Sequence, residues 1–368
     1  MPSKSQEFKL ISKTCDGDEI FISHDTIFVQ FAKKRNGIVS SWLNGGYSED
    51  LRGVFNHQLT QENIDRLGEG GILDYLIDLS GNYSNVFDFK TETNDSIKLS
   101  GLVTSADIKK YAIACEKFKG LEVWAITTAG VRVNAASAGD RASFYEIDGN
   151  YETIETDFKN KFGTINTILL INARLDKDSL LLAEMTAVEA KTVALRDLMV
   201  ASNYSEEIAT GTGTDGIAIF SNLESENLCE NATKHSKLGE MIAKVVIDSI
   251  KESLAKIQWM TPTYQLNALI RLDRFDLDLD CFYNDFLALN AEDEKKEFIK
   301  SLVEISHNPE LVAYVSLLIH IADQYRVGLL SKKTAEKTSE ALLESHFQRE
   351  DWNSMKLLLK FFLNENLK

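Results

Sequence analysis

The pattern of apolar and polar residues differs between the first 255 residues and the rest of the chain. In the first part, short runs rich in β-branched and aromatic residues are bounded by glycine or polar clusters, a pattern typical of β-strands. Strands are predicted at Glu19 to Phe31, Leu121 to Thr128, Ala142 to Ile147, Gly163 to Asn172 and Ile217 to Phe220.

Two stretches between these strands carry apolar residues at helical spacing. The first is predicted to bury one face formed by Met185, Val188, Leu195 and Met199, with Thr186 and Glu189 at the spacing of a capping box. The second runs from about Lys237 to Ile257, with a predicted buried stripe of Leu238, Met241, Ile242, Val245, Val246 and Ile250. Interleaved strands and helices predict an α/β fold with a mixed sheet, and α+β is the alternative.

Past Trp259 the strand pattern stops, glycine becomes rare, and acidic amphipathic helix patterns continue to Lys368. Pro262 cannot readily continue the preceding helix, because proline removes a backbone donor and restricts the residue before it. We therefore predict an α/β catalytic domain over residues 1–257 and a small all-α domain over residues 258–368. The helical pattern alone assigns no role or protein partner to the second domain.

Charge and cysteine usage exclude several classes of protein. The 368 residues include 56 acidic and 40 basic ones, and the net charge of −16 opposes non-specific binding to nucleic acid or to an anionic membrane. The four cysteines, Cys15, Cys115, Cys229 and Cys281, form no CxxC pair. Neither a zinc ribbon nor a disulfide framework is expected.

The sequence also gives no indication of a signal peptide or a transmembrane helix. Residues Met1 to Lys13 are polar and interrupted by charges, unlike the apolar core of a signal peptide. No run of about 18 apolar residues occurs, so no transmembrane helix is expected. These features predict a protein of the reducing cytoplasm that works without a membrane or nucleic-acid partner.

Small polar segments containing glycine lie beside the predicted strands. Small residues let the backbone approach a ligand closely, and threonine, asparagine and aspartate supply donors and acceptors. The segments are Ser40 to Gly46, Asn56-His57, Thr127 to Gly130 with Asn134 and Asp140, Gly163 to Asn166, Thr210 to Asp215, and Lys234 to Lys237. Each alone is also typical of a turn, and Asn44-Gly45-Gly46 is a common hairpin signal.

One segment matches a nucleotide-binding motif by spacing alone. Gly211 to Gly216 fits GxGxxG, but that fingerprint must open a helix, whereas Ile217 to Phe220 is predicted to be a strand. A nicotinamide or flavin cofactor is therefore not expected. A nucleotide-binding α/β protein is kept as an alternative that requires a helix from Gly216.

Histidines give a weak signal for metal or acid–base chemistry. His24, His57 and His235 show no HExxH or other tight ligand spacing, so no dedicated metal site is indicated. A lone histidine is more often a structural or surface group. His235 is different, because it lies between Lys234 and Lys237 at a predicted helix start, where basic residues oppose the helix dipole. That conflict makes His235 a candidate functional group.

Taken together and in order, these segments resemble the adenosylcobinamide amidohydrolase family of corrinoid salvage. The matching stretches are Ser40 to Gly46, Asn56-His57, Thr128 to Asp140, Gly163 to Asn166, Thr186 to Lys191, Ala209 to Asp215 and Lys234 to Gly239. They cover roughly residues 20 to 255. The chain departs from the family pattern at Val131-Arg132-Val133, and the resemblance does not extend to the C-terminal ~110 residues.

The resemblance implies hydrolysis of the amide that joins the aminopropanol arm to the corrin ring of adenosylcobinamide, which gives adenosylcobyric acid and aminopropanol. Such chemistry needs a nucleophile, an oxyanion site and an acid for the leaving amine. We expect His235 as acid or base, oriented by Asp215 or Glu189, and backbone amides and hydroxyls of Thr210 to Thr214 as the oxyanion site. A threonine nucleophile stays open, with Thr128, Thr210, Thr212 and Thr214 as candidates.

The expected site residues follow from these segments. The catalytic candidates are His235, Asp215, Glu189 and Thr210; the substrate-binding candidates are Asn44, Gly45, Gly46, His57, Thr128, Gly130, Asn134, Asp140, Asn166, Gly211, Thr212, Gly213, Thr214 and Lys234. No metal ligand is named, and metal dependence is left open. We expect these segments to converge on one cleft.

The corrinoid is expected to be a substrate and not a resident cofactor, because no DxHxxG segment is present. Its large amphipathic face needs a wide pocket with apolar walls, for which Trp42, Tyr47 and Trp124 are candidates, although core packing is the more ordinary role for such aromatic residues. A different class of function is also open. A corrinoid-binding or regulatory protein would keep the fold without hydrolysis and use its acidic helical extension to bind a partner.

Overall fold

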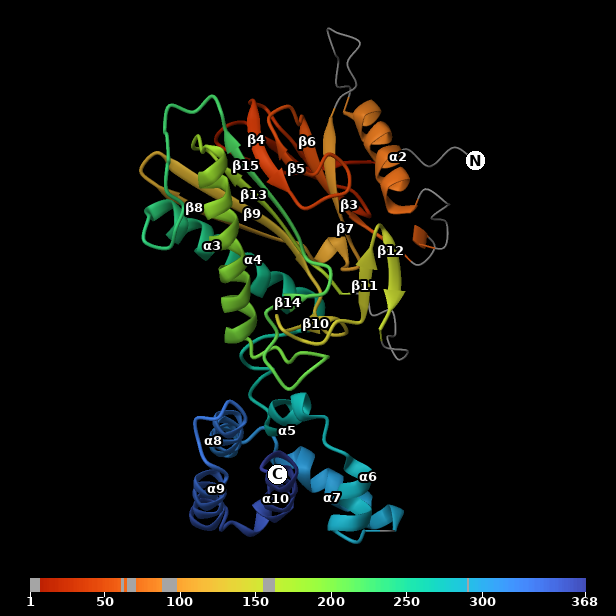
Figure 1. Cartoon of the computed structure of the whole chain (residues 1–368), viewed down its shortest axis with the longest axis vertical. Coiled ribbons are helices and arrows are strands. Elements are labelled where there is room, and N and C mark those ends of the chain that lie inside the picture. Colours follow the sequence, from red (N-terminus) through yellow and green to blue (C-terminus); the bar gives the residue numbers. More distant parts are fainter. Residues whose placement is uncertain (1–6, 61–62, 65–70, 88–97, 155–162, 290) are drawn as a thin grey trace. The chain divides into compact units, whose positions relative to one another are not determined.

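The computed structural model describes residues 7–60, 63–64, 71–87, 98–154, 163–289 and 291–368. The chain divides into two compact units, one comprising Met1–Tyr204 with Ile208–Met260 and the other Ser205–Glu207 with Thr261–Lys368. In Figure 1 the labelled strands all belong to the first unit, and the second contains helices. None of the described helices is long and apolar enough to cross a membrane.

The first unit contains two mixed β-sheets. One has the strand order β1 (Lys9–Lys13), β2 (Glu19–Ile22), β3 (Thr26–Gln30), β6 (Gly53–Gln58) and β7 (Leu99–Thr104). The other has the order β5 (Gly46–Ser48), β4 (Arg35–Val39), β15 (Gly216–Asn222), β13 (Ile165–Ile171), β9 (Leu121–Ala129) and β8 (Ala112–Phe118). Only β6 with β7 and β13 with β15 pair in parallel; the other pairs within these sheets are antiparallel. The predicted α/β unit with a mixed sheet is confirmed.

Helices cover the outer faces of the two sheets (Figure 1), and the cores follow the alternation of side chains along each strand. Residues such as Val29 and Ile168 pack between the sheets. Their neighbours point outward: Phe28 packs with Leu76 of α2 (Gly71–Val86), and Leu169 belongs to the core that includes α3 (Lys177–Asp197) and α4 (Lys237–Gln258). The order of layers is helix, sheet, sheet, helix.

Short elements complete the first unit. They are the 3₁₀ helix η1 (Ile108–Lys110), the ladder between β10 (Ala135–Ala136) and β14 (Gly211–Thr212), and the hairpin of β11 (Phe144–Ile147) and β12 (Asn150–Thr153). The hairpin pairs with no other described strand. Figure 1 shows β11 and β12 apart from the two large sheets.

Two sequence predictions need correction in detail. The stretch Glu19 to Phe31 is a hairpin and not one strand, because the chain turns at Ser23, whose main-chain N–H donates to the Thr26 carbonyl at 2.8 Å. Helix α3 begins at Lys177, so Thr186 lies inside the helix and donates its hydroxyl to the Ala232 carbonyl at 2.8 Å instead of capping. Half of the buried residues of α3 are alanines, whose small side chains allow close packing. Of the predicted buried face only Leu195 is buried, whereas Met185, Val188 and Met199 are 60, 43 and 37% exposed.

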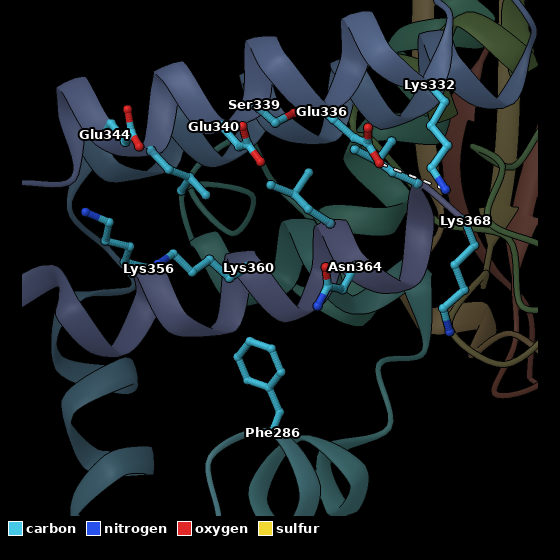
Figure 2. Close-up of a pocket in the computed structure, with 13 residues that line it drawn as sticks. Phe286, Lys332, Glu336, Ser339, Glu340, Glu344, Lys356, Lys360, Asn364 and Lys368 are labelled. Carbon is cyan, nitrogen blue, oxygen red and sulfur yellow. Dashed lines mark ion pairs between the residues drawn. The ribbon is translucent and has the colours of Figure 1, made fainter.

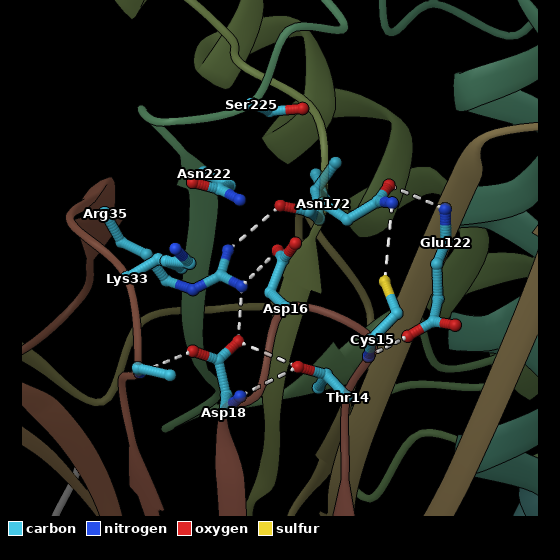
Figure 3. Close-up of polar contacts among 12 residues, drawn as sticks. Thr14, Cys15, Asp16, Asp18, Lys33, Arg35, Glu122, Asn172, Asn222 and Ser225 are labelled. Carbon is cyan, nitrogen blue, oxygen red and sulfur yellow. Dashed lines mark hydrogen bonds and ion pairs between the residues drawn. The ribbon is translucent and has the colours of Figure 1, made fainter.

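The two ends of the sheet sandwich differ in their polar contacts. Strand β9 runs from Leu121 at what we call the closed end to Ala129 at what we call the cleft end. At the closed end the buried Arg35 side chain donates to Asp16 at 2.7 Å, to Asp18 and to the Ile171 carbonyl at 3.0 Å (Figure 3). These bonds join the turn between β1 and β2 to the second sheet.

Glu122 adds a second connection at the closed end (Figure 3). Its carboxylate accepts from the Cys15 main-chain N–H at 2.8 Å, from Trp124 Nε1 at 2.6 Å and from Lys117 Nζ at 2.6 Å. Burial alone raises the pKa of Glu122, but these donors outweigh it and lower the pKa to about 2. The carboxylate is therefore ionised at neutral pH.

The second unit consists of helices joined by turns and loops, and its described residues contain no strand. Its elements are α5 (Ala268–Leu272), η2 (Asp273–Phe275), α6 (Leu279–Cys281), the π-helical turn η3 (Phe282–Phe286), α7 (Glu292–Ile305), α8 (Pro309–Arg326), α9 (Lys332–His346), η4 (Glu350–Trp352) and α10 (Asn353–Asn366). Asn308 caps α8 ahead of Pro309, and Ser331 caps α9, as expected for residues that accept from the first free amides. Its core forms around Phe282, Val315 and Phe362. The predicted all-α C-terminal part is confirmed.

Candidate functional site

A cleft of about 600 Å³ lies at the cleft end of the first unit. Its volume is in the usual range for small-molecule sites. The lining comes from segments far apart in the chain: Ser40 and Trp42; Leu59, Ile64 and Ile72; Gly101 to Ser105; Phe144 and Tyr151; Gly163, Thr164 and Asn166; and Gly213 to Gly216.

Two threonine hydroxyls lie side by side in the polar part of the cleft. Thr164 Oγ1 and Thr214 Oγ1 are 2.7 Å apart, and Thr214 Oγ1 also donates to the Gly163 carbonyl at 3.0 Å. Since the Thr214 proton is used in that bond, the Thr164 hydroxyl is the donor between the two. Thr164 is 5% exposed and immediately precedes β13. The pair places two hydroxyls that can share a proton in the polar part of the cleft, which Ser40 and Ser105 also line.

Asp215 holds the turn that carries Thr214. Its carboxylate accepts from the Thr212 main-chain N–H at 3.0 Å, the Thr212 hydroxyl at 2.5 Å and the Ile165 N–H at 3.0 Å. Lys191 Nζ lies 2.5 Å from the same carboxylate. A side chain on Gly211 would place its Cβ 2.4 Å from Asp215 Oδ2, so glycine is required there. The carboxylate therefore fixes the position of Thr214 relative to β13.

Buried amides connect the cleft to both sheets. Asn166 donates to Asn56 Oδ1 at 2.9 Å and to the Val103 carbonyl at 2.8 Å, and Asn56 donates to Thr128 Oγ1 at 2.8 Å. Asn56 and Thr128 are at most 2% exposed. Satisfied buried networks of this kind hold side chains in one arrangement. The cleft is therefore bounded by a preorganised polar wall.

A smaller cavity of about 200 Å³ adjoins the cleft and shares Ser40, Asp215 and Gly216 with it. It is otherwise lined by Ile165, Thr167, Glu184, Ala187, Val188, Lys191, Ile217 and Val246. Asp215 thus borders both spaces, with Lys191 on the side of α3.

Several predicted residues are in or next to this cleft. Asn166, Gly213, Thr214 and Asp215 line it. Thr128 lies behind Asn166, Thr212 holds Asp215, and the Gly130 main-chain N–H donates to the Thr164 carbonyl at 3.0 Å. Asn134 donates to the Gly163 carbonyl at 2.8 Å and accepts from Tyr204. The structure brings these members of the set together.

The proposed acid–base group lies elsewhere. His235 is exposed at the start of α4, near the closed end, where Lys237 Nζ is 4.7 Å from the centre of the Phe118 ring. Glu189 pairs with Lys234 on the surface. The Asp215 carboxylate instead contacts Lys191, Thr212 and Ile165. The expected orientation of His235 by Asp215 or Glu189 is therefore absent from the described structure. In the same segment Ser236 caps α4, because its side chain accepts from the Gly239 main-chain N–H, which is a structural role.

Thr210 is also used structurally. Its hydroxyl accepts from the Ala138 main-chain N–H at 2.8 Å, and its own N–H donates to Ala136. Of the segment expected to form an oxyanion site, only the part from Gly213 onward lines the cleft. Among the threonines considered as nucleophiles, Thr214 is the one that lines it.

His57 is buried in the first sheet. Its ring bonds with the Thr26 and Tyr75 hydroxyls at 2.9 and 2.8 Å. Desolvation lowers the pKa of His57 to about 4, and burial raises the pKa of Tyr75 to about 12, so both are neutral at pH 7. His57 does not line the cleft. This is the behaviour of a core histidine.

Two further predicted groups lie outside the cleft. Asn44 and Gly45 line a separate open depression of about 560 Å³ with Tyr47, and Gly46 begins β5 beside it with a φ of 76°. The Asn44 amide donates to the Leu99 carbonyl at 2.8 Å. Asp140 accepts from the Ser202 hydroxyl at 2.7 Å and so holds the loop that leads to β11.

Sequence reasoning missed Thr164 and the aromatic pair Phe144 and Tyr151. Thr164 was present in the motif Gly163 to Asn166, and its position beside glycine at a strand start was the available signal. Of the aromatic walls expected, Trp42 lines the cleft. Tyr47 lines the other depression, and Trp124 packs against the core between the sheets.

The second unit holds its own cavity, of about 640 Å³, shown in Figure 2. Glutamates of α9 (Glu336, Glu340 and Glu344) line one side and lysines of α10 (Lys356 and Lys360) the other. Phe286 of η3 and leucines of α9 and α10 complete the lining. The Ser339 hydroxyl is buried there without a hydrogen-bond partner among the described residues.

The sequence left metal dependence open and kept a nucleotide-binding protein as an alternative. No cluster of three or more histidine, cysteine, aspartate or glutamate side chains could hold a metal ion there. The GxGxxG segment is followed by strand β15 and not by a helix, which removes the nucleotide-binding alternative.

The fold and the cleft define an α/β protein with two mixed sheets between helices and a hydroxyl-lined site at one end. The model of the adenosylcobinamide amidohydrolase family matches residues 11–262. The chain belongs to this family, which confirms the resemblance seen in its motifs. The match includes every residue that lines the cleft and none beyond Pro262.

The chain is also similar to individual proteins. The uncharacterized protein MJ1613 of Methanocaldococcus jannaschii is 32% identical over 251 residues, which is 67% of this chain and 92% of the relative. Among solved structures, the PH0078 protein of Pyrococcus horikoshii OT3 is 14% identical with a TM-score of 0.32, covering 74% of this chain and 91% of its own. The L-aminopeptidase D-Ala-esterase/amidase of Ochrobactrum anthropi is 11% identical with a TM-score of 0.31, covering 70% and 83%.

Proposed function

We propose that the chain hydrolyses the amide between the aminopropanol arm and the corrin ring of adenosylcobinamide, in corrinoid salvage. The observation that carries this proposal is the family match over residues 11–262, which contains the whole cleft. The cleft supports it, because hydroxyls occupy its polar part and aromatic side chains its rim. The corrinoid is the substrate, and the proposed chemistry assigns no step to a resident cofactor.

In the proposed reaction Thr164 Oγ1 attacks the amide carbon. A C–O bond forms, the carbonyl electron pair moves onto oxygen, and the Thr164 proton passes to its hydrogen-bonded neighbour Thr214 Oγ1. Thr214 gives its own proton to the amide nitrogen as the C–N bond breaks, so aminopropanol leaves neutral. Water then hydrolyses the ester by the reverse relay and gives the corrinoid carboxylic acid.

Two further groups position this pair. Asp215 and Lys191 hold the turn from Thr212 to Thr214, and main-chain amides from Gly213 onward are the donors we assign to the oxyanion. Val in place of Thr at position 164 would keep the shape and remove the hydroxyl. Correct placement matters because loss of alignment by about 1 Å costs roughly 10²-fold in rate.

The test is incubation of the full chain with adenosylcobinamide, followed by chromatographic detection of adenosylcobyric acid. Wild type should form the acid, Thr164→Val should lose at least about 10³-fold in kcat, and Thr164→Ser should retain measurable turnover. Unchanged turnover of Thr164→Val rejects this nucleophile. Corrinoid binding without any product would instead identify a binding protein that kept the fold.

A further inference from the structure

The hairpin of β11 and β12 exposes an unusual number of large apolar side chains. Phe144, Tyr145, Ile147 and Tyr151 are 51, 42, 61 and 65% exposed. A two-stranded hairpin alone is marginally stable in water, and clustered exposed apolar residues mark places that bind something. Within the described chain, the hairpin pairs with no other strand.

The two faces of the hairpin are not equivalent. Glu146 is opposite Tyr151 in the ladder and Tyr145 is opposite Glu152, so Phe144 and Tyr151 share one face while Tyr145 and Ile147 share the other. The rings of Phe144 and Tyr151 are 5.6 Å apart, centre to centre. Both line the cleft, and neither Tyr145 nor Ile147 does. We call Phe144 and Tyr151 the inner face of the hairpin.

The loop that carries the hairpin is anchored to the first unit. Asp140 accepts from the Ser137 main-chain N–H and from the Ser202 hydroxyl, both at 2.7 Å. The turn itself has Asp148 and Gly149 at φ values of 52° and 76°, the combination that favours a tight two-residue hairpin. The inner face is therefore presented at a defined place along the cleft.

The remaining apolar lining includes Trp42, which is 65% exposed, with Leu59, Ile64 and Ile72. The same cleft contains the hydroxyls of Thr164 and Thr214. If the amide of a ligand lies at these hydroxyls, the rest of the ligand contacts the aromatic and aliphatic side chains of the cleft. A flat, largely apolar macrocycle with amide arms fits this arrangement, because its arms are polar and its ring faces are apolar.

We propose that the inner face of the β11–β12 hairpin is the subsite that holds the apolar face of the corrin macrocycle, with Phe144 and Tyr151 as its contact residues. This proposal rests on the proposed function. Aromatic side chains bury large areas at low entropic cost and stack on flat rings. Contacts far from the scissile amide contribute mainly to substrate binding, whereas the hydroxyl pair acts on the reacting bond.

The test measures corrinoid binding and turnover separately, on the full chain. The double variant Phe144→Ala/Tyr151→Ala should bind cobinamide at least about 10-fold more weakly in equilibrium dialysis, read by corrinoid absorbance, and show a matching rise in KM with kcat within about 3-fold. Phe144→Tyr/Tyr151→Phe should restore binding. The matched control Tyr145→Ala/Ile147→Ala, on the outer face, should bind as wild type does. Thermal melts check that all three variants fold.

The possible outcomes distinguish failure of the hairpin subsite from failure of the proposed function. Unchanged cobinamide binding in the inner-face variant, with wild type active, would overturn the subsite and leave the proposed function standing. Equal loss in inner-face and outer-face variants would also overturn it, because the hairpin would then act only as a folding element. Absence of both binding and turnover in wild type would overturn the proposed function and the subsite together.

Discussion

The cleft end and the closed end of the sheet sandwich both contain buried polar groups between the two sheets, but they use them differently. At the closed end, formal charges meet: Arg35 is 2% exposed and bonds to Asp16 and Asp18. At the cleft end, neutral amides and hydroxyls join the sheets through Asn56, Asn166 and Thr128. The cleft adjoins only the second set.

From this difference we expect the two ends to contribute differently to stability and to the proposed chemistry. Charges buried at the closed end are costly unless paired, so their pairing fixes how the sheets meet. Neutral groups between the sheets at the cleft end cost less to leave facing a cavity. The charged pair of Asp215 and Lys191 also borders the cleft, but on the side of α3 and not between the sheets. Breaking the charged pairs of Arg35 should therefore alter unfolding, and changing groups that line the cleft should mainly alter turnover.

The largest expected effect on stability is at Arg35. Arg35→Met should lower the free energy of unfolding by about 3–5 kcal/mol, because it leaves buried Asp18 without its cation. Urea unfolding followed by circular dichroism measures it. Lys33→Met is the control, since its pair with Glu224 is about half exposed and should matter by less than about 1 kcal/mol. Equal effects of the two variants would contradict the division between the ends.

Asp215→Asn should have the next largest effect, on turnover. It removes the charge that pairs with Lys191 and loosens the turn carrying Thr214, so we expect kcat to fall about 10²-fold. Glu189→Gln, on the same helix as Lys191, breaks only the exposed pair with Lys234 and is the matched control. Steady-state assays of both variants decide, and equal losses would return Glu189 to the catalytic set.

The fold could be predicted from the sequence further than the site could. Strands such as β9 and β13 and helix α4 carry strong local patterns, so their positions were predictable within a few residues. Convergence is a long-range property: Thr164 and Thr214 touch across 50 residues of chain. The helix-dipole argument favoured His235, but the Ser236 hydroxyl already accepts from a free main-chain N–H at the start of that helix. The local sequence pattern also does not reveal at which end of the sheets a loop lies.

His57 should make the free energy of unfolding depend on pH. Its folded pKa of about 4 is below the ordinary 6.5, so below pH 6.5 the unfolded chain binds a proton that the folded chain does not. The contribution of His57 to stability is therefore full above pH 6.5, falls by about 2 kcal/mol between pH 7 and 5, and levels off below about pH 4. His57→Gln should abolish this component of the slope in urea unfolding at several pH values. A slope unchanged by the variant would show that other groups cause it.

The smallest expected effect is at His235. His235 is exposed at the start of α4 near the closed end and does not line the cleft. His235→Gln should therefore leave kcat and KM within about 2-fold of wild type. The free energy of unfolding should change little, as for most surface substitutions. Ser236 still caps the helix in this variant. A kcat loss of about 10²-fold or more, the size of an acid–base contribution, would instead mean that His235 reaches the substrate. A rise in KM at constant kcat would mean that this surface binds part of the corrinoid, so the two constants together decide whether the chemistry stays at the cleft end.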